Sequence, residues 1–214
     1  TRPGAARVKQ GGASAASGVD KRQALDAARK AVAAGVDGLI VEGGEGGGFK
    51  SPNDVATMVL LPLVRSKVDV PIIAAGGFID GKTMAAAFAL GAEGIKIGTR
   101  MVSSAESPSH DNWKNAIVDA KETGTVFLNK FHSPALRALR TERTSRLERD
   151  PETNAMSEFG TAIDLYFGGD MEAAIPLTGQ VAGRIESVKP VAEILAETQE
   201  EFFETISSLG RSYL

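Results

Sequence analysis

The sequence predicts an α/β fold built from parallel strands, and three observations carry this prediction. Short apolar runs, typical of buried strands, alternate with segments of helical periodicity. Glycine pairs and clusters directly follow these runs, as they do where a strand gives way to a loop. The segments 34–41 and 90–97 also share one plan, in which a helix end, a glycine, an acidic residue and a second glycine lead into a strand. Such alternation indicates repeated βα units, arranged either as an open doubly wound sheet or as a (β/α)8 barrel.

The first half of the chain can be assigned element by element. Residues 20–34 carry one apolar face and end before Gly35, so they predict a helix with Asp20 as its N-cap. The apolar run 38–41 predicts a buried strand, because a glycine cluster follows it directly. The remaining elements of this half are a helix with Pro62 in its first turn that ends near Lys67, a strand over 70–75, a helix over 82–90 and a strand over 94–97.

The second half has fewer glycines and more charge. Residues 109–122 predict a helix, and residues 125–128 predict a short strand. The segment 137–157 carries many charges of both signs, which favours a solvated helix and loop; the alternative is a surface for an anionic ligand or a partner. Residues 190–209 place apolar side chains on one stripe after Pro190, so they predict a terminal helix that faces the core.

The composition bounds the class of protein. With 214 residues, 43% of them apolar and 24% charged, the chain has the profile of a globular protein. The net charge of −3 disfavours a nucleic-acid surface, and no apolar run approaches the ~20 residues that span a bilayer. Without cysteine there is no disulfide, thiol nucleophile or Cys-type zinc site, so a reducing cytoplasm is the expected compartment. The sequence predicts no metal site, no nucleic-acid partner and no membrane partner.

Two of the glycine turns are arranged as a phosphate site would be. Gly76-Gly77 and Gly98-Thr99 follow consecutive predicted strands. Backbone N–H groups in such turns converge on an anion, a following helix N-terminus adds positive potential, and the hydroxyl of Thr99 adds a donor. In a (β/α)8 barrel the phosphate commonly binds after the last two strands. The alternative is that these glycines only make tight turns between strands and helices.

A dinucleotide-binding open sheet is disfavoured. Its fingerprint requires Gly-x-Gly-x-x-Gly directly before a helix. The partial match at residues 44–49 ends in Phe49 and continues through Ser51 and Pro52 before any helix can begin.

Four strings of sequence carry a family resemblance. They begin with Val-Glu-Gly-Gly-Glu-Gly-Gly-Gly at 41–48, continue at 61–64 and 70–81, and end with the run Ala-Leu-Gly-Ala-Glu-Gly-Ile-Lys-Ile-Gly-Thr-Arg at 89–100. Together they resemble the FMN-dependent nitronate monooxygenase (2-nitropropane dioxygenase) family, which also includes flavin-dependent enoyl-thioester reductases. A looser match continues through 178–183 to the terminal helix. The resemblance implies a (β/α)8 barrel that binds FMN, with a smaller, mainly helical substrate domain inserted after the last strand.

The resemblance also implies which residues bind the flavin. Gly76 and Gly77 would hold the FMN phosphate together with Gly98 and Thr99, in agreement with the anion site inferred from the turns. NAD(P)H is a candidate reductant. The full set of implied cofactor-binding residues is Glu42, Gly47, Gly48, Gly76, Gly77, Lys96, Ile97, Gly98, Thr99 and Gln180.

Two positions depart from the family pattern. The first glycine loop of the family usually ends in a histidine that exchanges protons near the flavin, and here this position is Phe49, which cannot do so. Glu42 replaces a polar amide and is either a proton-exchanging acid or a hydrogen-bond acceptor for the flavin. The catalytic acid or base is therefore unknown. For His110 and His132, the only histidines, a structural role is favoured and a role toward the substrate is the alternative.

The number of predicted strands is too small for a complete barrel. The strands near residues 39, 72 and 96 correspond to the last three of eight, and residues 5–18 offer at most one poor additional strand. Because so few strands cannot close a barrel, we expect the others to come from a preceding segment of a longer protein or from a partner chain, for example in a homo-oligomer. The expected division is 1–102 for the flavin-binding βα units, 103–188 for the inserted substrate or lid region, and 189–214 for a terminal helix that packs on the barrel.

The leading functional hypothesis is an FMN-dependent oxidoreductase that oxidises alkyl nitronates with O2. The alternative is an NAD(P)H-linked reductase or dehydrogenase for enoyl thioesters of CoA or acyl carrier protein, which the phenylalanine at position 49 favours. A second alternative is a non-catalytic protein or fragment that binds a flavin or another phosphate ligand. For the enzyme hypotheses, the expected substrate is a small molecule.

Overall fold

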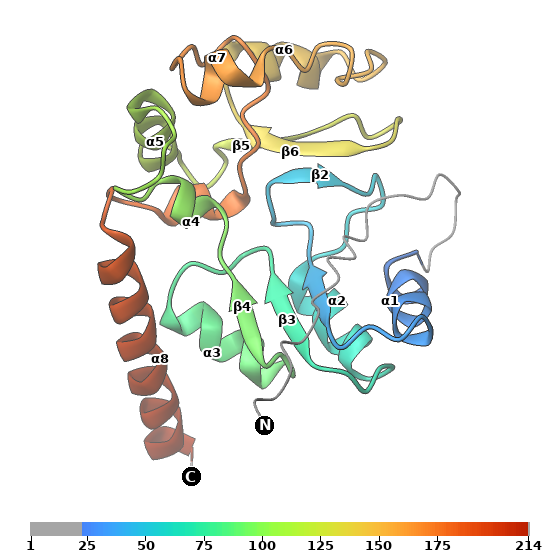
Figure 1. Cartoon of the computed structure of the whole chain (residues 1–214), viewed down its shortest axis with the longest axis vertical. Coiled ribbons are helices and arrows are strands. Elements are labelled where there is room, and N and C mark those ends of the chain that lie inside the picture. Colours follow the sequence, from blue (N-terminus) through green and yellow to red (C-terminus); the bar gives the residue numbers. More distant parts are fainter. Residues whose placement is uncertain (1–22, 214) are drawn as a thin grey trace, which may run out of the picture.

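The computed structural model describes residues 23–213, and a sheet of three parallel strands forms its lower part (Figure 1). In sheet order the strands are β1 (Leu39–Glu42), β3 (Ile72–Ala75) and β4 (Gly94–Lys96). They alternate with the helices α1 (Gln23–Ala33), α2 (Thr57–Arg65) and α3 (Gly81–Ala89). The predicted alternation of strands and helices is thus confirmed. The sheet is open, because no further strand of the described part of the chain pairs with β1 or β4.

One apolar core lies between this sheet and its helices. Leu61 of α2 and Ile72 and Ala74 of β3 have no exposed surface. Ile73 on the other face of β3 is 40% exposed, so the apolar run is fully buried on one face only among the described residues. In β1 only Val41 is buried, because β1 is an edge strand among the described residues.

Two helix ends test the sequence predictions. Gly35 adopts a φ of +78°, which confirms it as the residue that ends α1, whereas Asp20 lies outside the described residues. α2 begins at Thr57, so the prediction that Pro62 lies in the first turn is wrong. The helix starts earlier because the carboxylate of Glu45, from a distant loop, accepts hydrogen bonds from the backbone N–H of Thr57.

The three parallel strands end at one level. Glu42 is in register with Ala75, and Ala75 is in register with Lys96. Residues at the same level of neighbouring parallel strands point to the same face, so these side chains form a row across the carboxyl ends of the strands. The glycine turns that follow the strands gather beside this row, at the end of a parallel sheet where ligands usually bind.

A second sheet, which is antiparallel, lies above the first (Figure 1). In sheet order it contains β2 (Gly48–Lys50), β6 (Ala135–Leu139) and β5 (Thr125–Leu128). β5 matches the strand predicted at 125–128, whereas β6 was not predicted. The surrounding helices are α4 (Thr99–Val102), α5 (Asp111–Val118), α6 (Glu142–Arg149), α7 (Ala162–Tyr166) and the 3-10 helix η1 (Gln180–Arg184).

This sheet changes two expectations for the second half. Residues 103–188, expected to be mainly helical, contain the helices α5, α6, α7 and η1 but also the antiparallel strands β5 and β6, and β6 pairs with β2 from the first glycine loop. The expected solvated character of 137–157 is wrong for Arg137, which lies in β6 with 6% of its surface exposed. The charged side chains of α6, such as Arg146 and Arg149, are exposed as expected.

The terminal helix α8 (Val191–Tyr213) packs along α3. Its residues Ile194 and Phe202 are buried, but Leu195, Ile206 and Leu209 are about half exposed. The expectation that the whole apolar stripe faces the core is therefore wrong for these three residues, because α3 covers only one side of the stripe.

No helix among residues 23–213 combines the length and the apolar character that are needed to cross a membrane.

Gly81 allows α3 and α8 to approach closely, and its replacement tests this contact. A Cβ at Gly81 would stand 2.2 Å from the backbone nitrogen of Phe202 and 2.6 Å from the carbonyl oxygen of Thr198. Gly81→Ala is therefore expected to lower the free energy of unfolding by about 1–3 kcal/mol through overpacking. Denaturant unfolding measures this loss. Gly210→Ala on α8, where a Cβ meets no atom within 4 Å, is the control; an equal result for the two variants would contradict the prediction.

Candidate functional site

A cavity of about 190 Å³ lies at the carboxyl ends of β1, β3 and β4, and we call it the strand-end cavity. Of the ten residues predicted to bind a cofactor, Ile97 and Gln180 do not line it. Gln180 is exposed, and its backbone N–H donates to the carbonyl oxygen of Glu45 at 2.9 Å. The predicted residues that the structure brings together around the cavity are Glu42, Gly47, Gly48, Gly76, Gly77, Lys96, Gly98 and Thr99.

The glycines of the cavity are required for different reasons. Gly76 has a φ of +81°, and a Cβ there would stand 2.9 Å from the carbonyl oxygen of Gly43. A Cβ at Gly47 would stand 2.5 Å from the backbone nitrogen of Gly179. These two glycines therefore serve the packing of the loops. At Gly98 a Cβ would meet no atom within 4 Å, so the fold leaves open space beside this residue.

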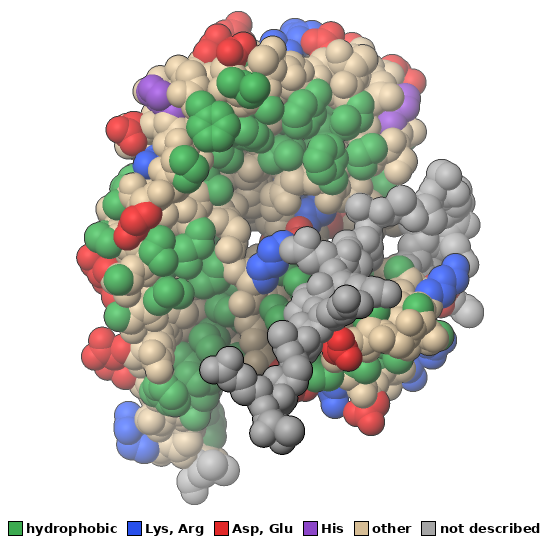
Figure 2. Space-filling model, in the orientation of Figure 1, with side chains coloured by type: hydrophobic (Ala, Val, Ile, Leu, Met, Phe, Trp, Pro, Cys, Tyr) green, Lys and Arg blue, Asp and Glu red, His purple; other side chains and the backbone are tan. Residues whose placement is uncertain are grey.

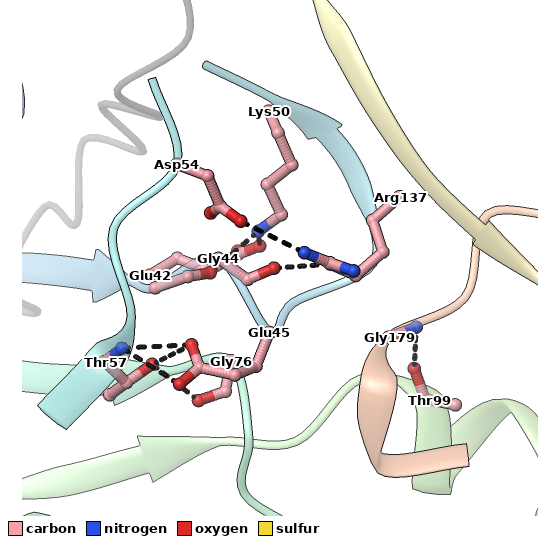
Figure 3. A network of polar contacts seen from close by, with 11 residues as sticks. Glu42, Gly44, Glu45, Lys50, Asp54, Thr57, Gly76, Thr99, Arg137 and Gly179 are labelled. Atoms are coloured by element: carbon pink, nitrogen blue, oxygen red, sulfur yellow. Dashed lines mark hydrogen bonds and ion pairs between the residues drawn. The ribbon is translucent and has the colours of Figure 1, made fainter. Parts of the chain in front are cut away.

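Thr99 joins the cavity to the loop before η1. Its hydroxyl oxygen accepts a hydrogen bond from the backbone N–H of Gly179 at 2.9 Å (Figure 3). This contact uses a lone pair of the oxygen, so the hydroxyl proton remains available as the donor that the sequence predicted. Thr99 is also the first residue of α4, directly after Gly98.

Glu45 fixes the first glycine loop to α2. Its carboxylate accepts from the backbone N–H of Thr57 at 3.0 Å and from the hydroxyl of Thr57 at 2.7 Å (Figure 3). The side chain of Ala56, the N-cap residue, cannot make such bonds. A carboxylate at this helix end is favourable because it meets unpaired N–H groups and the positive end of the helix dipole.

Glu42 forms an ion pair with Lys50. The ammonium of Lys50 contacts Oε1 of Glu42 (Figure 3). It also donates to the carbonyl oxygen of Gly43 at 3.1 Å. The side chain of Lys50 is 8% exposed and that of Glu42 is 35% exposed, so the cation is buried behind a carboxylate that lines the cavity.

Arg137 connects the antiparallel sheet to the first glycine loop. Its Nε donates to the carbonyl oxygen of Gly44, and its Nη2 lies 3.1 Å from a carboxylate oxygen of Asp54 (Figure 3). The guanidinium also lies over the ring of Phe127, 5.0 Å from its centroid. Burial lowers the pKa of Arg137, and the nearby carboxylates of Asp54 and Glu45 oppose this shift. Arginine nevertheless stays protonated at neutral pH, so the loop is held by a buried cation.

Phe49 and the two histidines lie outside the lining of the strand-end cavity. Phe49 is 48% exposed and stacks on Phe159, with ring centroids 6.0 Å apart. Figure 2 shows hydrophobic side chains gathered over this upper part of the molecule, where the antiparallel sheet lies. His110 caps α5 by accepting from the backbone N–H of Asn112 at 3.1 Å, and Nε2 of His132 lies 3.1 Å from the carbonyl oxygen of Glu152. Both histidines therefore make the structural contacts that the sequence favoured.

Sequence reasoning missed the side chains that hold the glycine loop in place. They are Glu45, Lys50, Asp54 and Arg137. Arg137 is 93 residues from Gly44 in the sequence, so no local pattern links them. The available signal in the sequence was that Glu45, Lys50 and Asp54 lie within or close to the glycine cluster.

A larger cavity, of about 430 Å³, lies beside α3 and α8 and contains none of the predicted residues. Arg100 is the basic residue in its lining, and it is already bonded to the carbonyl oxygen of Ser187 at 2.7 Å. The acidic residues of the lining are Asp80, Glu197, Glu200, Glu201 and Glu204. So many carboxylates repel a phosphate, which leaves the strand-end cavity as the candidate phosphate site.

Within residues 23–213, no group of three or more acidic or histidine side chains is placed to hold a metal.

The comparisons with known proteins agree on one family. A sequence model of nitronate monooxygenases matches residues 7–201. One relative is a dehydrogenase of Mycobacterium tuberculosis with the name (3aS,4S,5R,7aS)-5-hydroxy-7a-methyl-1-oxo-octahydro-1H-indene-4-carboxyl-CoA dehydrogenase. It is 42% identical to this chain over 146 residues, which are 67% of this chain and 40% of that protein. A probable nitronate monooxygenase of Staphylococcus aureus is 32% identical over 177 residues, which are 76% of this chain and 50% of that protein.

Two solved structures of enzymes are similar to the structure of this chain. FabK from Thermotoga maritima superposes with a TM-score of 0.83 at 39% identity, over 89% of this chain and 62% of FabK. A nitroalkane oxidase from Streptomyces ansochromogenes superposes with a TM-score of 0.71 at 26% identity, over 86% of this chain and 57% of the oxidase. The chain spans half or less of the length of the two curated relatives named above.

Proposed function

The chain belongs to the nitronate monooxygenase family, a family of flavin-dependent enzymes with a TIM-barrel fold, and from this premise we propose that it binds FMN in the strand-end cavity and acts as an FMN-dependent oxidoreductase. The observation that carries the proposal is the open space beside Gly98, which lines the cavity together with Gly77 and Thr99. A phosphate fits this chemistry, because the backbone N–H groups of the glycine turns and the hydroxyl of Thr99 can donate to it.

The residues present suit one end of the cofactor. The cavity is smaller than the ~300 Å³ at which small-molecule sites usually begin, so the described residues would enclose the phosphate end and leave the rest of the cofactor on the open side. Gly77, Gly98 and Thr99 would hold the phosphate, and Glu42 and Lys96 would face the remainder. Bound FMN supplies the capacity to accept and return electrons, whereas the protein supplies binding and orientation.

For the reaction, we propose the oxidation of alkyl nitronates with O2. The support is the family and the 32% identity to a probable nitronate monooxygenase. Phe49 cannot remove a proton from a nitroalkane, and neither histidine lines the cavity. A nitronate has already lost this proton, so its oxidation does not require a base at these positions.

A second candidate reaction is the reduction or dehydrogenation of an acyl thioester, with NAD(P)H as the electron donor for reduction. Two observations favour it. The identity to the carboxyl-CoA dehydrogenase is 42%, and the identity to FabK is 39%, both higher than the 32% to the probable nitronate monooxygenase. The phenylalanine at position 49 also removes the proton-exchanging group that a nitroalkane substrate needs.

The proposal is tested on the purified protein supplied with FMN. We expect bound flavin absorbance, oxygen uptake with alkyl nitronates, and no increase in this rate when NADH is added. NADH oxidation that depends on an enoyl-CoA, without oxygen uptake on nitronates, would instead establish the second reaction. Bound flavin without either activity would indicate a binding protein, and a protein that retains no flavin would contradict the proposed function.

A further inference from the structure

The charged side chains that line the strand-end cavity are not balanced. Glu42, Glu45 and Lys96 are its ionisable lining residues. Glu42 is paired with the buried ammonium of Lys50, and Glu45 is bonded to Thr57. Within residues 23–213 no side chain forms an ion pair or hydrogen bond with Lys96, so its ammonium is the uncompensated charge of the cavity.

Glu45 is also close to a buried cation. The guanidinium of Arg137 lies near enough for the Glu45 carboxylate to raise the pKa of Arg137. Arg137 is itself paired with Asp54, so Glu45 has a nearby cation but no ion pair with it, and the Glu45 carboxylate is held by its hydrogen bonds to Thr57. Lys96, which is exposed, is therefore the one charged lining side chain that no described side chain binds, and a ligand group with negative charge is favoured next to its ammonium.

The position of Lys96 indicates which part of a flavin this charge would meet. Lys96 on β4 is in register with Ala75 on β3, and Ala75 is in register with Glu42 on β1. Lys96 and Glu42 are therefore at the two ends of the row across the strand ends, separated by two strand spacings of about 4.8 Å each. A ligand that extends from the phosphate turn at Gly98 toward Glu42 must pass over this row, because Lys96, Ala75 and Glu42 all line the cavity.

We propose that Lys96 stabilises the negative charge that the flavin ring carries after reduction. The inference rests on the proposed function, since it requires FMN in the cavity. Uptake of two electrons and one proton converts the neutral oxidised ring into an anion, and an unpaired ammonium beside the ring binds this anion more tightly than the neutral form. Lys96 would thereby raise the midpoint potential of the bound flavin and make it easier to reduce.

The test compares Lys96→Met with Lys67→Met in the flavin-loaded protein. Lys67 is an exposed lysine in the turn before β3, at the opposite end of the sheet, and its loss removes the same charge. The dissociation constants of oxidised FMN and of riboflavin are measured by fluorescence, and the midpoint potential is measured by reduction in the presence of a redox dye.

For Lys96→Met we expect the affinity for reduced FMN to fall about tenfold more than the affinity for oxidised FMN, which lowers the two-electron midpoint potential by about 30 mV. Lys96→Arg, which keeps the charge, should retain most of the wild-type potential, and Lys67→Met should retain all of it. An unchanged potential in Lys96→Met would overturn the inference. So would a loss of affinity for FMN without any loss for riboflavin, because Lys96 would then contact the phosphate. If the wild-type protein binds neither flavin, the proposed function itself fails, and the inference fails with it.

Discussion

Gly98→Leu is expected to lose about 100-fold of the affinity for FMN while its melting temperature stays at the wild-type value. The structure leaves the space beside Gly98 open, with no atom within 4 Å of a Cβ, so the larger side chain costs little in the free protein. In the complex, the same side chain would occupy the space proposed for the phosphate. The loss corresponds to one or two hydrogen bonds to a charged group, at about 1.5–3 kcal/mol each.

The measurement is a fluorescence titration with FMN beside a thermal unfolding curve. Gly210→Leu is the matched control, because Gly210 also has open space around it but lies on α8, away from the strand-end cavity. The control should bind FMN as the wild type does. If Gly98→Leu binds FMN with wild-type affinity, the phosphate does not lie at Gly98. If it unfolds at a lower temperature, the open space is needed for folding.

Arg137→Met is expected to lower the free energy of unfolding by about 3 kcal/mol and the melting temperature by roughly 6–12 °C. The variant leaves the carboxylate of Asp54 and the carbonyl oxygen of Gly44 without their partner. Removing one member of a buried pair costs about 3–5 kcal/mol, and the lower value applies because the Asp54 side chain is 36% exposed. FMN affinity should fall as well, because the first glycine loop lines the cavity.

Denaturant unfolding and FMN titration together check this prediction. Arg149→Met, an exposed position at the end of α6, removes the same charge and should leave both quantities unchanged. Asp54→Asn should cost less than Arg137→Met, because the amide oxygen still accepts a hydrogen bond from Arg137. A melting temperature within 2 °C of the wild type, as expected for a surface contact, would contradict the role assigned to Arg137.

The parts of the fold that could be predicted are those that local chemistry determines. A glycine such as Gly35 ends a helix because it adopts a positive φ, and an apolar run such as that of β3 forms a buried strand wherever the helices pack. The turns at Gly77 and Gly98 could be placed at one edge of the sheet because parallel strands end together. The remaining cofactor residues were implied by the family resemblance, and the structure brings eight of the ten together around one cavity.

The parts that could not be predicted depend on contacts between distant segments. β6 has no alternating pattern, because all five of its residues are buried between β2, β5 and the rest of the molecule. The early start of α2 depends on Glu45, twelve residues away, and the position of the glycine loop depends on Arg137. The sequence could not distinguish Gly76, which is needed for contact with Gly43, from Gly98, which faces open space.

The pairing of β2 with β6 also fixes how long the first glycine loop must be. In this register Gly48 and Lys50 lie opposite Arg137 and Ala135 on one face, and Phe49 lies opposite Leu136 on the other. A slip of β2 by one residue along β6 would exchange the two faces and place Phe49 where Lys50, the partner of Glu42, now stands. The length of this loop is therefore as strongly constrained as its residues, and relatives of this chain that keep the ion pair should show no insertion or deletion between β1 and β2.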